Sequence, residues 1–128
     1  MPMCLGVVDS ITELGRADEG CVAVSGSHGG RSAAHYAVAA RPLLSVFNDA
    51  GVGLDAAGIA ALAMLQAQSL AACTVAHHSA RIGEAHSTLA HGVISHVNDA
   101  AHRLGLRPGQ RLQAALHTLH SPFQETAP

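Results

Sequence analysis

Three short apolar runs separated by helix-length segments constrain the fold of this sequence more than any other feature. The runs cover residues 20–25, 43–47 and 71–76, and the alanine-rich segments between them cover residues 31–40 and 55–68. Short runs that contain β-branched residues predict buried strands, and their alternation with helices predicts parallel strands joined by right-handed crossovers. We therefore expect an α/β domain of two or three layers around a short, mainly parallel sheet.

The sequence on either side of this core predicts further elements. Residues 5–8 and 11–14 are predicted to add a strand or an antiparallel hairpin before the first parallel strand. Apolar residues at helical spacing within 93–104, ending at Gly105, predict a helix. Residues 111–119 predict a last helix after a Pro-Gly turn.

The length of 128 residues suits one domain whose core needs neither disulfides nor a structural metal. We assign that domain to residues 1–120 and a flexible tail to residues 121–128. Alanine and glycine are abundant, whereas the aromatic residues are only Tyr36, Phe47 and Phe123. A core of small side chains lets helices approach a sheet closely.

The charged residues exclude several classes of function. A net charge of -2 and seven dispersed arginines give no basic patch for nucleic acid. The absence of lysine excludes a Schiff base, a lysine general base and the phosphate-binding lysine of a P-loop. The sequence has no apolar run of membrane-spanning length and no signal-peptide pattern at its start. We therefore expect a cytoplasmic protein with no nucleic-acid or membrane partner.

Neither the cysteines nor the histidines have the spacing of a metal site. Cys4, Cys21 and Cys73 are far apart in the sequence and form no CxxC pair, so we expect reduced, buried thiols. The ten histidines include no HExxH motif. We expect no metal and no redox cofactor.

Ligands of open α/β sheets bind beyond the carboxyl ends of the strands, so the loops there hold the candidate site. In the first loop, the amides of Gly29 and Gly30 precede a helix and are predicted to bind an anion, with Ser27 and His28 facing it. A helix N-terminus disfavours the charged form of a histidine, so His28 is a candidate for proton transfer. The alternative for His28 is turn packing.

In the second loop, Asn48 and Asp49 directly follow a predicted buried strand and therefore need hydrogen-bond partners or a ligand. Asp49 is either a general base or the cap of a turn. Residues 51–56 match the GxGxxG/A dinucleotide fingerprint formally, with Asp55 as the expected N-cap of the next helix. The acidic residue expected at the end of the following strand is missing, which weakens that match.

The third loop is the longest and the richest in polar side chains. Arg81 is the leading candidate to hold a carboxylate or phosphate, and His77, His78, Ser79 and Glu84 could move protons or orient groups. The alternative is a solvated surface pair between Arg81 and Glu84.

These loops predict an enzyme that acts on a small anionic metabolite by acid/base or hydrolytic chemistry. The candidate catalytic residues are His28, Asp49 and His78. The candidate binding residues supply hydrogen bonds from all three loops: Ser27, Gly29, Gly30, Asn48, Ser79, Arg81 and Glu84. The alternative is a non-catalytic module that binds a ligand or nucleotide, or assembles with other subunits, and whose histidines are structural.

We also expect the chain to form a homo-oligomer. A three-stranded parallel core in so short a chain leaves sheet edges and alanine-rich helix faces, such as Ala60 and Ala61, for another subunit to cover. Light scattering at micromolar concentration should give a mass above that of one chain, and the mass of a monomer would contradict this prediction.

Overall fold

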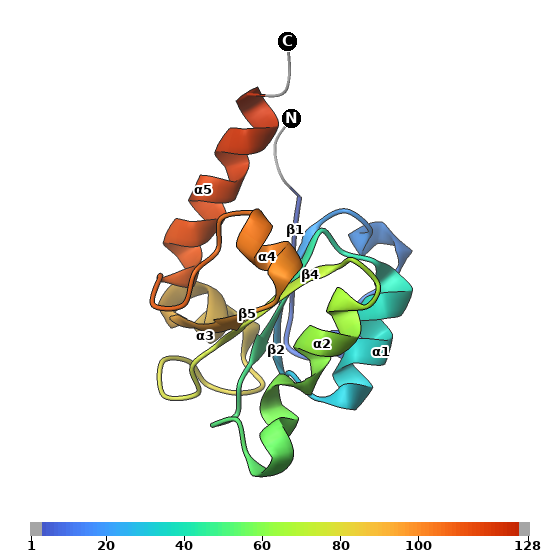
Figure 1. The fold of residues 1–128 in the computed structure, drawn as a ribbon, viewed down its shortest axis with the longest axis vertical. Coiled ribbons are helices and arrows are strands. Elements are labelled where there is room, and N and C mark those ends of the chain that lie inside the picture. The colour runs from blue at the N-terminus through green and yellow to red at the C-terminus, as the bar shows by residue number, and fades with distance from the viewer. Residues whose placement is uncertain (1–3, 126–128) are drawn as a thin grey trace.

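The computed structural model describes residues 4–125, with side chains up to residue 119, as a five-stranded sheet in the order β1-β2-β3-β4-β5 (Figure 1). The strands are β1 (Leu5–Val8), β2 (Val22–His28), β3 (Leu44–Asn48), β4 (Ala71–Val75) and β5 (Ile94–Val97). The first four strands are parallel, and β5 is antiparallel to β4. The expected α/β class with a mainly parallel sheet is confirmed.

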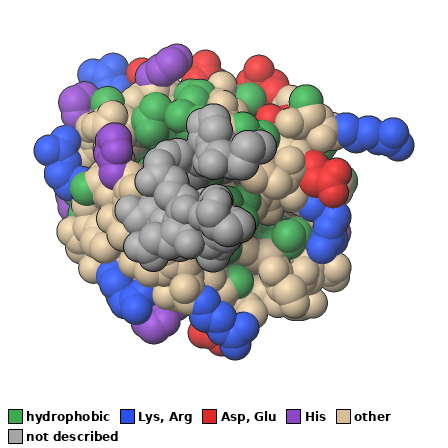
Figure 2. All heavy atoms as spheres, turned by 90° about the horizontal axis from the view of Figure 1, so that it is seen from above, with side chains coloured by type: hydrophobic (Ala, Val, Ile, Leu, Met, Phe, Trp, Pro, Cys, Tyr) green, Lys and Arg blue, Asp and Glu red, His purple; other side chains and the backbone are tan. Residues whose placement is uncertain are grey.

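Helices cover both faces of the sheet, giving three layers (Figure 1). On one face lie α1 (Arg31–Ala40) and α2 (Ala60–Gln66), and on the other lie α3 (Ala85–His91), α4 (Asp99–Arg103) and α5 (Leu112–Glu125). In the described residues, no helix combines the length and the apolar character that crossing a bilayer requires. Helix α5 ends at the end of the molecule where the parallel strands begin, and Figure 2 shows arginine and acidic side chains spread round the rim of that end.

The two core clusters follow from the alternation of side chains along the strands. In β3, Leu44 and Val46 belong to the cluster beneath α4 and α5, whereas Phe47 faces α1 and α2. Ala34 and Ala37 of α1 are fully buried in the second cluster. These small side chains bring α1 close to the sheet, as the composition suggests.

The N-terminal segment forms the strand predicted over residues 5–8 but not the antiparallel hairpin. Strand β1 pairs in parallel with β2, and residues 11–14 form no strand. Instead, the short 3-10 helices η1 (Ile11–Glu13) and η2 (Arg16–Asp18) connect β1 to β2. Ser10 and Glu13 form a capping box at η1, in which the Ser10 amide donates to Glu13 Oε2 at 3.1 Å. This Ser-x-x-Glu pattern is a helix-start signal, and it explains why residues 11–13 form a 3-10 helix and not the second strand of a hairpin.

The helix predicted over residues 93–104 is correct only for α4 (Asp99–Arg103), because Ile94–Val97 form strand β5. Val93, Ile94 and Val97 fit helical spacing, but pairing with β4 holds Ile94–Val97 extended. The side chain of Asn98 then caps α4, accepting from the amide of Ala101 at 2.9 Å.

Two other helix boundaries also differ from the sequence-based prediction. Residues 54–59 form the 3-10 segment η3 (Leu54–Ile59) before α2, and Asp55 has a left-handed φ of 55° in it, so Asp55 is not the N-cap of α2. Helix α5 continues past the expected end at residue 119 to Glu125, and the rest of the predicted tail, residues 126–128, lies outside the described residues.

The expectation that all three cysteines are reduced is wrong for two of them. Cys4 and Cys21 form a disulfide at the start of β1 and just before β2. The parallel register brings these two residues together, because the Val22 amide donates to the Cys4 carbonyl at 2.9 Å. Cys73 is a free, buried thiol as expected, and burial raises its pKa to about 12, which suits core packing and not nucleophilic attack.

Gly26 in β2 is required by the close approach of the third loop. A Cβ at this position would lie 2.4 Å from the Glu84 nitrogen and 2.5 Å from the Gly83 carbonyl carbon. Gly26→Ala should therefore lower the free energy of unfolding by about 2 kcal/mol or more, as measured by urea denaturation, because backbone must move.

Gly15→Ala is the matched control for that substitution. Gly15 has extended dihedrals, and a Cβ there would meet no atom within 4 Å. Its effect on the free energy of unfolding should stay below about 1 kcal/mol. Equal effects of the two substitutions would contradict the packing argument.

Candidate functional site

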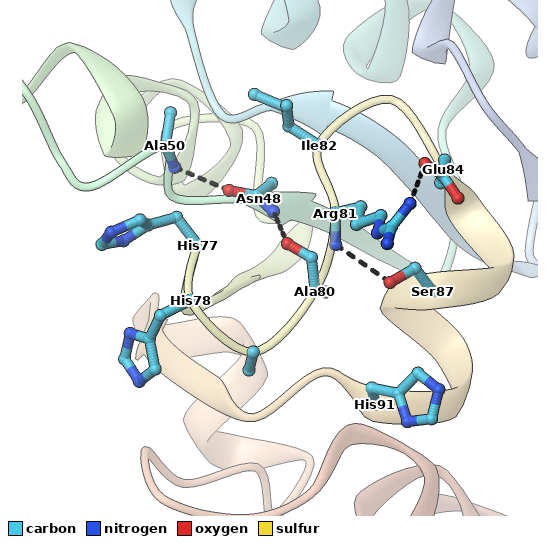
Figure 3. A pocket seen from close by; sticks show the side chains of 11 residues that line it. Asn48, Ala50, His77, His78, Ala80, Arg81, Ile82, Glu84, Ser87 and His91 are labelled. Atoms are coloured by element: carbon cyan, nitrogen blue, oxygen red, sulfur yellow. Dashed lines mark hydrogen bonds and ion pairs between the residues drawn. The ribbon is translucent and has the colours of Figure 1, made fainter.

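Asn48, the last residue of β3, joins the second and third loops. Its side chain is fully buried, Nδ2 donates to the Ala80 carbonyl at 3.1 Å, and Oδ1 accepts from the Ala50 amide at 2.8 Å (Figure 3). A buried amide needs such partners on both of its polar atoms. Asn48 therefore fixes the relative position of the two loops, although it also lines the cavity described below.

Asp49 follows Asn48 and is held by backbone donors. Its Oδ1 accepts from the amides of Gly51 at 2.8 Å and His77 at 3.0 Å. Burial alone raises the pKa of Asp49, but hydrogen bonds from Gly51, Ser95 and His77, together with the electrostatic effect of the His77 imidazole, outweigh burial and lower the pKa below 3.8. Asp49 is therefore a carboxylate at neutral pH, and it caps the turn, which was the alternative to a general base.

The imidazole of His77 lies beside this carboxylate. His77 Nδ1 is 3.5 Å from Asp49 Oδ1, and 58% of the His77 side chain is exposed. The ring stands over Gly51, where an added Cβ would lie 3.5 Å from His77 Cε1, and it meets the His78 ring edge-on with centroids 5.5 Å apart. Because Nδ1 faces Asp49, Nε2 is the ring nitrogen left to exchange protons with a ligand.

The third loop is fixed at several points. The Gly83 amide donates to the Gly26 carbonyl at 2.6 Å, and the Arg81 amide donates to Ser87 Oγ at 2.9 Å. Ser79 Oγ donates to the Ala76 carbonyl at 2.6 Å and accepts from the Val93 amide at 3.0 Å, so it has a structural role. This ordered loop can present its side chains in a preformed arrangement.

A residue that follows β1 forms a hydrogen bond with the first residue of α3. Asp9, directly after β1, accepts from the Ala85 amide at 2.9 Å through its carboxylate. The Asp9 carbonyl accepts from the Gly26 amide at 3.1 Å. Asp9 was not among the predicted site residues, although it directly follows the apolar run at residues 5–8.

A cavity of about 790 Å³ lies beside the third loop. Figure 3 shows that its lining comes from the end of β3, the third loop and α3: Asn48, Ala50, His77, His78, Ser79, Ala80, Arg81, Ile82, Glu84, Ser87 and His91. The side chain of Arg81 is 81% exposed, and its guanidinium Nη1 lies 3.9 Å from Glu84 Oε2. That exposed pair is weak, so Arg81 remains able to bind an anion.

The cavity gathers five of the sequence-predicted residues, Asn48, His78, Ser79, Arg81 and Glu84. Three further polar residues of the lining were not selected: His77, Ser87 and His91. His77 had been considered for proton transfer, and the signal for choosing it was its place after β4. Because β3 and β4 are neighbours in register, residues just beyond their ends meet.

The first loop does not reach this cavity. The Gly29 amide donates to the Asn48 carbonyl at 3.0 Å, the Gly30 amide donates to the His28 carbonyl at 2.9 Å, and Ser27 Oγ accepts from the Ile11 amide at 2.9 Å. The groups chosen as anion donors thus have intramolecular partners. His28 and Gly30 line a second cavity, so the structure does not bring His28 and Arg81 to one cavity.

Residues 51–56, which match the dinucleotide fingerprint formally, do not have the backbone path of a nucleotide-binding loop. Its last two residues, Asp55 and Ala56, have left-handed φ values of 55° and 56° within η3. The segment therefore does not lead directly into the N-terminus of α2, where a pyrophosphate would bind. Over the described part of the chain, no three His, Cys, Asp or Glu side chains lie together as a metal site would require.

Comparisons with protein-family models, with curated proteins and with solved structures find no match to this chain.

The pKa of Asp49 makes stability depend on pH. Its folded pKa lies below the ordinary 3.8, so its stabilising effect is present above that value and is lost as the pH falls through the folded pKa. Asp49→Asn should lower the free energy of unfolding at pH 7 by about 1–3 kcal/mol, and the difference should shrink below pH 4. Urea denaturation of both proteins at several pH values measures this difference in the free energy of unfolding.

Asp55→Asn controls for the loss of one negative charge in the same loop. Asp55 is exposed and forms no ion pair with any residue of the described part of the chain. Its substitution should change the free energy of unfolding at pH 7 by less than about 0.5 kcal/mol. If the effect of Asp49→Asn on the free energy of unfolding stays constant from pH 7 to pH 2, Asp49 does not stabilise the fold as a carboxylate.

Proposed function

We propose that the chain binds a small anionic metabolite in the cavity beside the third loop and acts on it by acid/base chemistry. His77 is the proton-transfer residue, and Arg81 binds the anionic group. The observation that carries this proposal is the pairing of His77 with the charged Asp49 at the rim of a cavity that also contains Arg81.

Proton transfer is supported by the surroundings of His77. An imidazole has two ring nitrogens and can both accept and return a proton, which suits acid/base catalysis. When Nε2 accepts a proton, the Asp49 carboxylate stabilises the imidazolium that forms. Asp49 is thus a positioning residue in this proposal, and His78 is the neighbouring histidine at the same cavity.

Binding of an anion is supported by Arg81. Its guanidinium can form two parallel hydrogen bonds with a carboxylate or a phosphate. Glu84 is its only ion-pair partner in the described part of the chain, and at 3.9 Å an incoming anion can displace it. The cavity volume of about 790 Å³ lies in the usual range for small-molecule sites.

Two reaction classes fit this arrangement. His77 could remove a proton from a substrate carbon next to the anionic group and return it elsewhere, which is isomerisation or elimination. His77 could instead take a proton from water as the water attacks an electrophilic centre, which is hydrolysis. Neither class requires a redox cofactor.

A non-catalytic binding module is the second candidate. Asp49 Oδ1 caps the turn by accepting from the amides of Gly51 and His77, so the presence of this carboxylate can be explained without catalysis. In that case the cavity would bind the same anions, but no turnover would follow.

Substitutions at Arg81 and His77 should separate binding from proton transfer. After a thermal-shift screen of phosphate and carboxylate metabolites has given a ligand, Arg81→Ala should weaken its binding by about 1.5–3 kcal/mol, because a charged hydrogen bond is lost. His77→Ala should lower kcat about a hundredfold with little change in affinity, since it removes the proton acceptor. Calorimetry and steady-state kinetics measure the two effects.

His28→Ala is the matched control, because His28 is exposed and lines the other cavity. It should leave both the affinity and the rate unchanged. Normal kinetics of a folded His77→Ala protein would refute catalysis by His77 and favour the binding module. Normal affinity of a folded Arg81→Ala protein would refute the anion contact.

A further inference from the structure

A second cavity, of about 540 Å³, lies at the same edge of the sheet but on the side of α1 and α2. It is lined by the end of β2, the start of α1, η3 and α2: His28, Gly30, Arg31, Leu54, Asp55, Ala57, Ala60, Ala63 and Met64. It shares no lining residue with the cavity of the proposed function. The two cavities are therefore lined by separate sets of side chains.

Two opposite charges line this second cavity without neutralising each other. Arg31 and Asp55 are both exposed, and neither forms an ion pair with another residue in the described part of the chain. Arg31 suits a carboxylate, and Asp55 suits an ammonium group. A ligand with only one charge would leave the other side chain without a partner.

The remaining lining is apolar. Ala60, Ala63 and Met64 of α2 form a wall, and the thioether of Met64 can adapt to ligands of different shape. Leu54 is 86% exposed, although it belongs to the same lining. A large exposed leucine at the border of a cavity is a surface that an apolar ligand group would cover.

The backbone next to Leu54 is unusual. Asp55 and Ala56 both have left-handed φ values, a conformation that is costly for residues with side chains. Such conformations cluster at ligand sites, where strain is tolerated for function. Here they place the Leu54 and Asp55 side chains at the border of one cavity.

We propose that the second cavity binds a free α-amino acid with an apolar side chain. Its carboxylate contacts Arg31, its ammonium group contacts Asp55, and its side chain lies against α2 and Leu54. A fatty acid would leave Asp55 unpaired beside a second negative charge, and an amine would do the same to Arg31. The zwitterion satisfies both charges, and this inference does not depend on the proposed function.

The test is isothermal titration calorimetry of the purified chain with leucine and with two analogues that each lack one charge. The analogues are 4-methylpentanoate, without the ammonium group, and 3-methylbutylamine, without the carboxylate. Leucine should bind, and each analogue should bind about tenfold more weakly or worse, because one charged hydrogen bond is lost. Glycine, which has no apolar side chain, should also bind more weakly than leucine.

Three variants complete the test, with circular dichroism to verify folding. Arg31→Gln and Asp55→Asn should each weaken leucine binding about tenfold or more. Arg16→Gln, which removes an exposed arginine that lines neither cavity, should not change it. No heat of binding for leucine up to about 10 mM would overturn the proposal, as would equal binding of either analogue or full affinity in a folded Arg31→Gln protein.

Discussion

The hydrogen bonds of Asn48 hold together the edge of the sheet on which both cavities depend. Its side chain joins the Ala50 amide to the Ala80 carbonyl, and its own carbonyl accepts from the Gly29 amide. One residue thus connects all three loops. Because the side chain is fully buried, losing it would leave polar backbone groups without partners, at a cost of about 1–3 kcal/mol for each group. The geometry of the third loop and the turn at Asp49 both rely on this connection.

The central elements could be predicted because their periodicity is unambiguous. Helix α1 has the predicted bounds, and strands β2, β3 and β4 lie within one to three residues of the expected ends. Strand β5 could not be predicted, because Val93, Ile94 and Val97 suit either a helix or a strand, and only pairing with β4 decides between them. The Cys4–Cys21 disulfide likewise follows from the register of β1 and β2, which the spacing of the cysteines does not reveal.

The candidate site was predicted as a set of loops, but the grouping of side chains required the structure. Arg81 and His78 do line one cavity, as their shared loop suggests. His28 lies at another cavity, because the first loop turns toward α1 while the third loop crosses β2 at Gly26. The Gly29 amide bonds to a neighbouring strand, a partner that depends on the tertiary path of the chain.

The disulfide also affects how β1 opens in local unfolding. As an edge strand, β1 has one neighbour in the sheet, so its backbone would ordinarily fray more readily than the central strands. The Cys4–Cys21 bond attaches the start of β1 to the chain just before β2, and Asp9 beyond its other end holds the Ala85 and Gly26 amides. We therefore expect the disulfide to keep β1 and Asp9 in one cooperative unit with β2, so that the Gly26 and Ala85 amides exchange their hydrogens more slowly.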